Sequence, residues 1–123
     1  MKYDDISEAM RRFLGGFEAF RKMGFKADDI FCLVQPSARA HGAVSCFTYL
    51  KAQGKEFSLE CGLVEDEEAF SEEYTRVSTA LNAHEIPQED LDRIWLESEP
   101  FQRLADFSAA VIAKGFIPPR IAS

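Results

Sequence analysis

This sequence lacks the marks of a membrane, secreted or metal-binding protein. No run of about 18 apolar residues is present, so we expect no membrane span. Residues 1–5 are charged and do not form the apolar stretch of a secretory signal. Cysteine is scarce: Cys32, Cys46 and Cys61 are an odd number, with neither the spacing of a disulfide framework nor a Cys-x-x-Cys zinc knuckle. We therefore expect reduced thiols in the cytoplasm, with no metal and no cofactor.

Basic residues are also in short supply. The chain has 14 Lys and Arg against 21 Asp and Glu, for a net charge of −7. Residues 1–64 carry nine basic and eight acidic side chains, whereas residues 65–123 carry five and thirteen. The acidic C-terminal half repels phosphate backbones and anionic lipid surfaces, which argues against direct nucleic-acid binding and against membrane association.

Convincing repeats, low-complexity tracts and linkers are missing as well. The 123 residues are the common size of one domain and too few for two good cores. What the chain does have is phenylalanine, with eleven Phe beside three Tyr and one Trp. Each buried aromatic removes about 150–250 Å² from water, so residues 1–123 are expected to form a single domain whose core needs no disulfide or metal.

The first segment with a clear period is residues 6–23. Apolar side chains recur at steps of three and four residues, which predicts a helix with one wide apolar face. They are Ile6, Met10, Phe13, Leu14, Phe17 and Phe20. Asp5 and Glu8 have the spacing of a capping box at its start. Gly15-Gly16 costs about 1 kcal/mol per glycine relative to alanine, which predicts close packing of another backbone or a bend, or alternatively a ligand that approaches the bare backbone.

Three strands are expected next, at residues 30–35, 43–51 and 55–63. The first is apolar on both faces, as in a central strand. The second and third flank a short hairpin turn. The third alternates between apolar and polar residues. Its core-facing positions are expected to be Phe57, Leu59, Cys61 and Leu63.

The register of the hairpin decides which face of the second strand is buried. A two- or four-residue loop pairs Leu50 with Phe57. A three-residue loop with Gly54 in the left-handed region pairs Tyr49 with Phe57 and buries Phe47 as well. We favour the three-residue loop, because it buries two aromatics and because Gln-Gly is a weaker two-residue turn than Asn-Gly.

The rest of the chain is predicted to be helical, at residues 66–82, from Pro87 to about Trp95, and from Phe101 to about Lys114. Gly24 and Gly115 each follow a predicted helix and precede a Phe, which is typical of left-handed C′ caps. The order is an N-terminal helix, a three-stranded antiparallel meander, then three C-terminal helices packed on one face. This order predicts an α+β fold.

The connection between the first two strands holds the candidate ligand-binding residues, Ser37, Arg39 and His41. A guanidinium, a titratable imidazole and a hydroxyl could together bind a carboxylate or phosphate. The alternative is a solvated hairpin loop. No nucleophile motif such as Gly-x-Ser-x-Gly accompanies them, so no catalytic residue is assigned.

Residues 65–73 hold six acidic side chains out of nine. Glu67, Glu68, Glu72 and Glu73 are the candidate partner-binding residues, because an acidic docking surface would speed association with a basic protein and make it salt-dependent. The alternative is a solvated helix face whose charges complement the helix dipole.

The aromatic content exceeds what one face of a three-stranded sheet can cover. Phe47 and Tyr49, or Phe31 and Leu33, are therefore expected on its second face. An exposed apolar face or edge of a sheet suggests a homodimer.

In size, acidity and opening order of elements, residues 5–82 resemble the small chaperones of bacterial secretion systems. The resemblance implies a protein that binds another protein, although that family adds two strands where this chain predicts only helices. We expect a small acidic, non-catalytic interaction, adaptor or chaperone-like protein. One alternative is a small-molecule-binding protein or modest enzyme with a pocket near Arg39 and His41. Another is an acidic mimic of nucleic acid.

Overall fold

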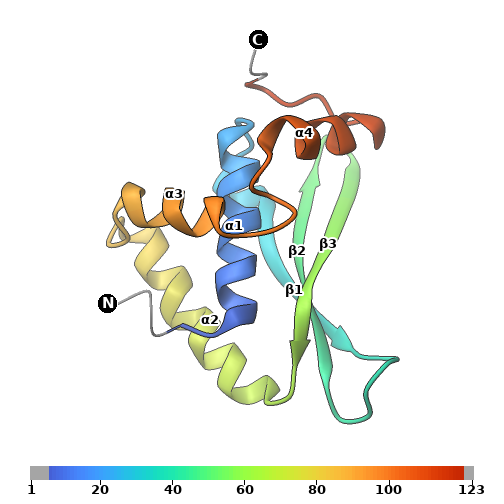
Figure 1. The fold of residues 1–123 in the computed structure, drawn as a ribbon, viewed down its shortest axis with the longest axis vertical. Coiled ribbons are helices and arrows are strands. Elements are labelled where there is room, and N and C mark those ends of the chain that lie inside the picture. The colour runs from blue at the N-terminus through green and yellow to red at the C-terminus, as the bar shows by residue number, and fades with distance from the viewer. Residues whose placement is uncertain (1–5, 121–123) are drawn as a thin grey trace.

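The computed structural model describes residues 6–120 and contains one sheet with its helices gathered on one side (Figure 1). The elements in chain order are α1 (Glu8–Lys22), the short 3₁₀ helix η2 (Ala27–Asp29), β1 (Ile30–Pro36), β2 (Val44–Ala52), β3 (Lys55–Val64), α2 (Glu67–Asn82), α3 (Gln88–Leu96) and α4 (Leu104–Ala113). Figure 1 shows α1 against the sheet, α2 and α3 further out on the same side, and α4 across one end of the strands. The predicted α+β class and element order are confirmed.

Helix α1 is the centre of the core. The side chain of Ser7 caps it by accepting a hydrogen bond from the Met10 amide at 3.3 Å. Asp5, the predicted capping residue, lies outside the described residues. The apolar stripe is buried as expected, and Met10, Phe13, Leu14 and Phe20 are at most 1% exposed. Each such side chain stabilises the fold by about 1.5–3 kcal/mol relative to an exposed one.

Both predicted glycine caps are confirmed, and they meet in space. Gly24 and Gly115 have φ of 95° and 96°, in the left-handed region. The amides of Phe25 and Phe116 bond back to carbonyls five residues earlier. The two Phe rings then pack edge to face, with centroids 6.1 Å apart. The C-terminal segment is thereby held over the end of α1, where the amide of Arg120 donates to the Met23 carbonyl at 2.7 Å.

The sheet has the order β1-β2-β3, and its hairpin register differs from the one we favoured. Leu50 pairs with Phe57, and the loop is the two residues Gln53 and Gly54, with φ of 58° and 72°. Glutamine succeeds here because its side chain both donates to and accepts from the backbone of Ile117, each at 2.8 Å. The prediction of a three-residue loop was wrong, because turn preferences depend on neighbouring residues and do not include these two bonds to a residue 64 positions away.

A β-bulge then shifts the alternation of β3. Phe47 pairs with Glu60 and Cys46 with Gly62, so Cys61 is the extra residue. Leu63, predicted to face the core, is instead 45% exposed. Val64 takes the buried position in its place.

The last helix begins later than predicted. Phe101, expected within it, lies in the connection from α3 and is 1% exposed. Its carbonyl accepts a hydrogen bond from Trp95 Nε1 at 2.6 Å, and its ring packs edge to face on Phe107. The indole bond and the buried ring hold this connection against the core, which delays the start of α4 to Leu104.

Candidate functional site

One face of the sheet carries large apolar side chains that no helix within residues 6–120 covers. Phe31, Leu33, Phe47 and Tyr49 alternate with the core-facing residues of β1 and β2 and are each half-buried. They are cross-strand partners, Phe31 with Tyr49 and Leu33 with Phe47, so all four point the same way. The rings of Phe31 and Tyr49 stack, with centroids 5.1 Å apart and planes 25° apart. We call the surface formed by these four residues the outer face.

The sequence anticipated this surface only in part. It predicted that either Phe47 and Tyr49, or Phe31 and Leu33, would lie on the face of the sheet that the helices do not cover. The favoured register would have buried Phe47 and Tyr49 against the helices. The observed register puts both pairs on the outer face and gives the core Cys46, Thr48 and Leu50.

The charges beside the outer face are of both signs. Lys51 of β2 stands opposite Glu56 of β3 in the register. Arg39 reaches from the β1–β2 loop and forms an ion pair with Glu60 of β3. The pKa of Tyr49 is raised, mainly because its hydroxyl is partly desolvated and also because it hydrogen-bonds to the Glu56 carboxylate. The outer face is thus an apolar strip with an equal number of positive and negative groups at its margin.

The predicted ligand-binding residues Ser37, Arg39 and His41 lie in this same exposed loop. The hydroxyl of Ser37 accepts from the Arg39 amide at 3.1 Å, which is a local loop contact. The Arg39 guanidinium is engaged by Glu60, and His41 is exposed. Binding of a carboxylate or phosphate by these three residues therefore stays a prediction, and Arg39 would first have to leave Glu60.

Both edges of the sheet are capped near their middle. On β1, the Cys32 amide donates to the Tyr74 hydroxyl of α2 at 3.4 Å. On β3, the Cys61 carbonyl accepts from Arg12 Nη1 of α1 at 3.1 Å. Such side-chain contacts discourage the addition of another strand at an edge.

The predicted acidic partner-binding residues lie at the start of α2. Glu67, Glu68 and Glu72 are exposed. Glu73 instead accepts hydrogen bonds from both the amide and the hydroxyl of Ser7, at 2.9 and 2.5 Å. Glu73 therefore has a structural part in fastening α2 to the start of α1, which leaves three of the four carboxylates facing solvent.

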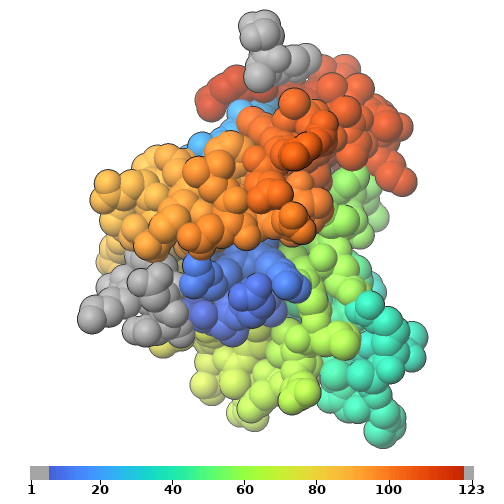
Figure 2. Space-filling view, viewed as in Figure 1, coloured from blue at the N-terminus to red at the C-terminus, as the bar shows by residue number. Residues whose placement is uncertain are grey.

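A groove of about 720 Å³ lies between α1, β3 and the connection from α3 to α4. Figure 2 shows the blue surface of α1 between the orange connection and the green strand. Its basic groups are already paired, Arg11 with Glu97 at 2.7 Å and Arg12 with Glu8 at 3.2 Å. The first ion pair joins α1 to the end of α3 and the second lies within α1, and together they leave the groove with an acidic balance and no free cation for an anionic ligand.

A smaller hollow of about 300 Å³ contains a buried carboxylate, Glu18. Its Oε1 accepts from Gln88 Nε2 at 2.6 Å and lies 3.7 Å from Lys22 Nζ, while its Oε2 has no partner among the described residues. Lys22 also pairs with Asp92 at 2.7 Å and lies over the Trp95 ring. With Arg21 and Arg120 at its margin, the hollow mixes both signs of charge and favours neither a cation nor an anion.

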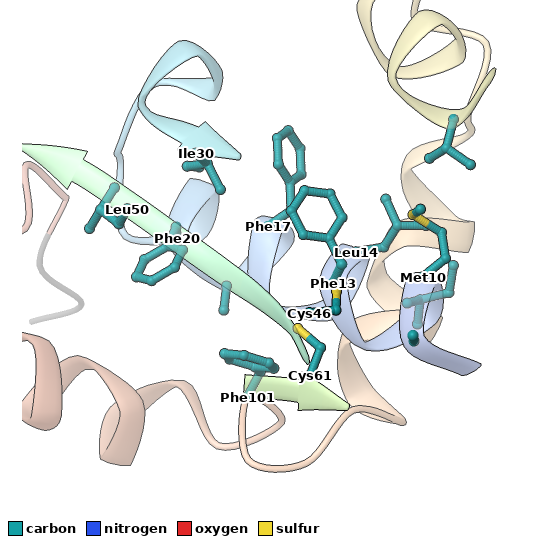
Figure 3. Packing of buried hydrophobic residues seen from close by; sticks show 14 of the residues in the cluster. Met10, Phe13, Leu14, Phe17, Phe20, Ile30, Cys46, Leu50, Cys61 and Phe101 are labelled. Atoms are coloured by element: carbon teal, nitrogen blue, oxygen red, sulfur yellow. The ribbon is translucent and has the colours of Figure 1, made fainter. Parts of the chain in front are cut away.

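The three cysteines, far apart in sequence, form a row across the core side of the sheet. The sulfur atoms of Cys32 and Cys46 are 3.3 Å apart, and Cys61 Sγ lies 3.0 Å from Thr48 Oγ1. Figure 3 shows Cys46 and Cys61 between α1 and Phe101. The pKa of Cys46 is raised by its hydrogen bond with Cys32 and by burial. The pKa of Cys61 is raised by its hydrogen bond with Cys46 and by burial. Both thiols are therefore protonated at neutral pH and poor nucleophiles.

Residues 6–120 contain no group of three or more His, Cys, Asp or Glu side chains arranged to hold a metal ion. In the same part of the chain, no helix has both the length and the apolar character needed to cross a bilayer. No protein-family model, no curated protein and no solved structure matches the sequence or the fold.

Proposed function

We propose that this chain is a non-catalytic protein-interaction domain, adaptor or chaperone-like, that docks a protein partner through the outer face. One observation carries the proposal: within residues 6–120 the helices lie on one side of the sheet (Figure 1), and Phe31, Leu33, Phe47 and Tyr49 are left on the other. Contiguous, partly exposed apolar surface of this kind is typical of interaction sites. The aromatic rings supply contact area with few rotatable bonds, which makes them effective anchors.

The face rather than an edge is the proposed contact. The bonds from Tyr74 to β1 and from Arg12 to β3 oppose strand addition at both edges. In the part of the chain that the structure describes, no helix covers the flat strip between them.

The non-catalytic part of the proposal rests on the state of the reactive groups. The Cys46 and Cys61 thiols are held protonated, and Arg39 is paired with Glu60. A catalytic site would need an activated nucleophile or a base with an orienting partner. Three free thiols also suit a reducing compartment, and on that ground we place the protein in the cytoplasm.

The acidic start of α2 is a second proposed contact. Glu67, Glu68 and Glu72 project into solvent, where they would steer a basic partner toward the molecule. This contact is separate from the outer face, so removal of the three carboxylates should slow association of a basic partner and reduce its salt dependence while binding at the outer face stays unchanged.

Site-specific photo-crosslinking in the source cells tests the proposal. A benzophenone amino acid at position 47 samples the outer face, and the same probe at Leu96, which is 57% exposed on α3, is the matched control. We expect a discrete protein adduct from position 47 and none of that mass from position 96. The absence of any position-47 adduct, or identical adducts from both positions, would overturn the proposal.

A further inference from the structure

The outer face is electrically neutral in a strongly acidic protein. The charged residues of β1, β2 and β3 that share its side of the sheet are Lys51, Glu56 and Glu60, and Arg39 joins them from the loop through its ion pair with Glu60. Two positive and two negative charges cancel there, whereas the whole chain carries −7. The excess negative charge therefore lies on the other surfaces.

This charge balance has a consequence for the partner. A strongly basic or strongly acidic protein would find no complementary field on the outer face. A surface that carries both signs in equal number can instead complement itself. In a two-fold dimer the same patch of each copy faces its counterpart. If the two-fold axis is perpendicular to the strands, the Lys51–Glu56 end of one copy lies over the Arg39–Glu60 end of the other.

We propose that the occupant of the outer face is a second copy of this chain; this inference rests on the proposed function and names its partner. The two sheets pack face to face, with the helices outside, to give a helix–sheet–sheet–helix dimer of four layers. The stacked rings of Phe31 and Tyr49, with Leu33 and Phe47 beside them, form the apolar centre. The charged side chains of Arg39, Lys51, Glu56 and Glu60 form its margin.

The size of the face sets the expected strength of the dimer. Strand β3 has ten residues, which at 3.3 Å per residue is about 30 Å, and three strands about 4.8 Å apart give a width of about 14 Å. The flat area is then about 400 Å² per copy, or about 800 Å² in total. This value leaves out the extra surface of side chains that project from the sheet and of the charged residues at its margin. Specific interfaces begin near 1,000–1,200 Å², so we expect a reversible dimer whose population depends on concentration.

Sedimentation equilibrium and light scattering over a concentration series test the inference on the purified full chain. We expect a monomer mass of 13.9 kDa at low concentration and twice that value at high concentration. Phe47→Ser removes a central aromatic and should raise the dissociation constant by about thirtyfold, the effect of a hot-spot residue. The apolar centre should keep the wild-type dimer intact in high salt.

Charge variants provide the matched control. Lys51→Glu makes the face acidic and should raise the dissociation constant by about fivefold to tenfold at low salt, with a smaller effect at high salt. Lys114→Glu changes the net charge equally but lies at the end of α4, away from the outer face, and should have little effect. Glu56→Lys combined with Lys51→Glu restores the balance and should restore most of the affinity. Because Lys51 is exposed, this series stays informative even if Phe47→Ser fails to fold.

Two results would overturn the inference. A monomer at every concentration excludes the second copy, and so does a dimer that Phe47→Ser, Lys51→Glu and Lys114→Glu leave equally intact, because its interface lies elsewhere. The crosslink from position 47 separates these failures from that of the proposed function. An adduct with a different protein keeps the docking face and removes only self-association, whereas a monomer without any adduct removes both.

Discussion

Gly16, in the middle of α1, lies directly against Thr48 in the central strand β2. A Cβ atom at Gly16 would be 2.6 Å from Thr48 Oγ1 and 2.8 Å from the Phe101 ring. Its neighbour Gly15 faces Ser98, whose Oγ would be 2.3 Å from an added Cβ. The glycine pair thus lets the sheet and the end of α3 approach α1 from two sides. Close packing was predicted at this position, although the neighbours are mainly side chains rather than another backbone.

Gly16→Ala should therefore destabilise the protein. In an open helix this change stabilises by about 1 kcal/mol, because alanine is the better helix former. Here the added methyl overpacks a buried site, which typically costs about 1–3 kcal/mol, and we expect a net loss. Urea unfolding measures it. Thr48→Ala in the same chain removes the nearest atoms and should reduce the penalty of Gly16→Ala; a Gly16→Ala variant as stable as the wild type would contradict the prediction.

The buried carboxylate of Glu18 depends on Lys22. Lys22→Met removes the ammonium 3.7 Å from Glu18 Oε1 and 2.7 Å from Asp92. We expect a loss of about 3 kcal/mol in the free energy of unfolding, because a buried charge is left uncompensated. Adding Glu18→Gln to this variant removes that charge and should recover most of the loss. If the double variant is no more stable than Lys22→Met alone, the destabilisation comes from packing instead.

The two buried thiols should resist modification and weaken the fold at alkaline pH. Cys46 and Cys61 have pKa values raised above those of the unfolded chain. Their contribution to stability is therefore complete below the unfolded pKa near 9 and is lost as the pH rises above it. The slope should be near zero at pH 8 and should approach about 1.4 kcal/mol per pH unit for each thiol as the pH rises above 9. Urea unfolding between pH 8 and 10 measures the slope, and iodoacetamide labelling with peptide mapping measures access. Rapid labelling of Cys46 or Cys61 in the folded protein would contradict the prediction.

The bond between Gln53 and Ile117 should hold the C-terminal segment on the hairpin. In Gln53→Ala the amide of Ile117 loses its acceptor, and we expect its hydrogen exchange to accelerate by at least about tenfold. Gln53→Asn is the informative control, because asparagine suits the turn better but its side chain is one methylene shorter. It should keep the hairpin register while also freeing the Ile117 amide to exchange. Unchanged exchange at Ile117 in both variants would show that other contacts hold the segment.

Local patterns predicted most of the elements but not all of their boundaries. The three- and four-residue period of α1 and the glycine–phenylalanine caps at Gly24 and Gly115 depend on neighbouring residues only, and both predictions were confirmed. The start of α4 was predicted three residues early, because the bond from Trp95 to the Phe101 carbonyl and the burial of Phe101 depend on tertiary packing.

The candidate sites divide in the same way. The sequence identified Arg39 and Glu73 as free groups for a ligand or partner. Folding brought Glu60 to Arg39 and Ser7 to Glu73, contacts across 21 and 66 residues that no spacing rule reports. The row of three thiols was hidden for the same reason, since each cysteine belongs to a different strand.

The sequence by itself determined the α+β class and the order of elements, because hydrophobic period, capping residues and turn residues act over a few positions along the chain. Only the tertiary structure decided which side of the sheet faces the helices. That choice is one of register, and a one-residue shift exchanges the two faces of a strand. Here it is settled by packing against α1 and by the contact of Gln53 with Ile117, 64 residues away. The same choice placed Phe47 and Tyr49 on the outer face, where the proposed function resides.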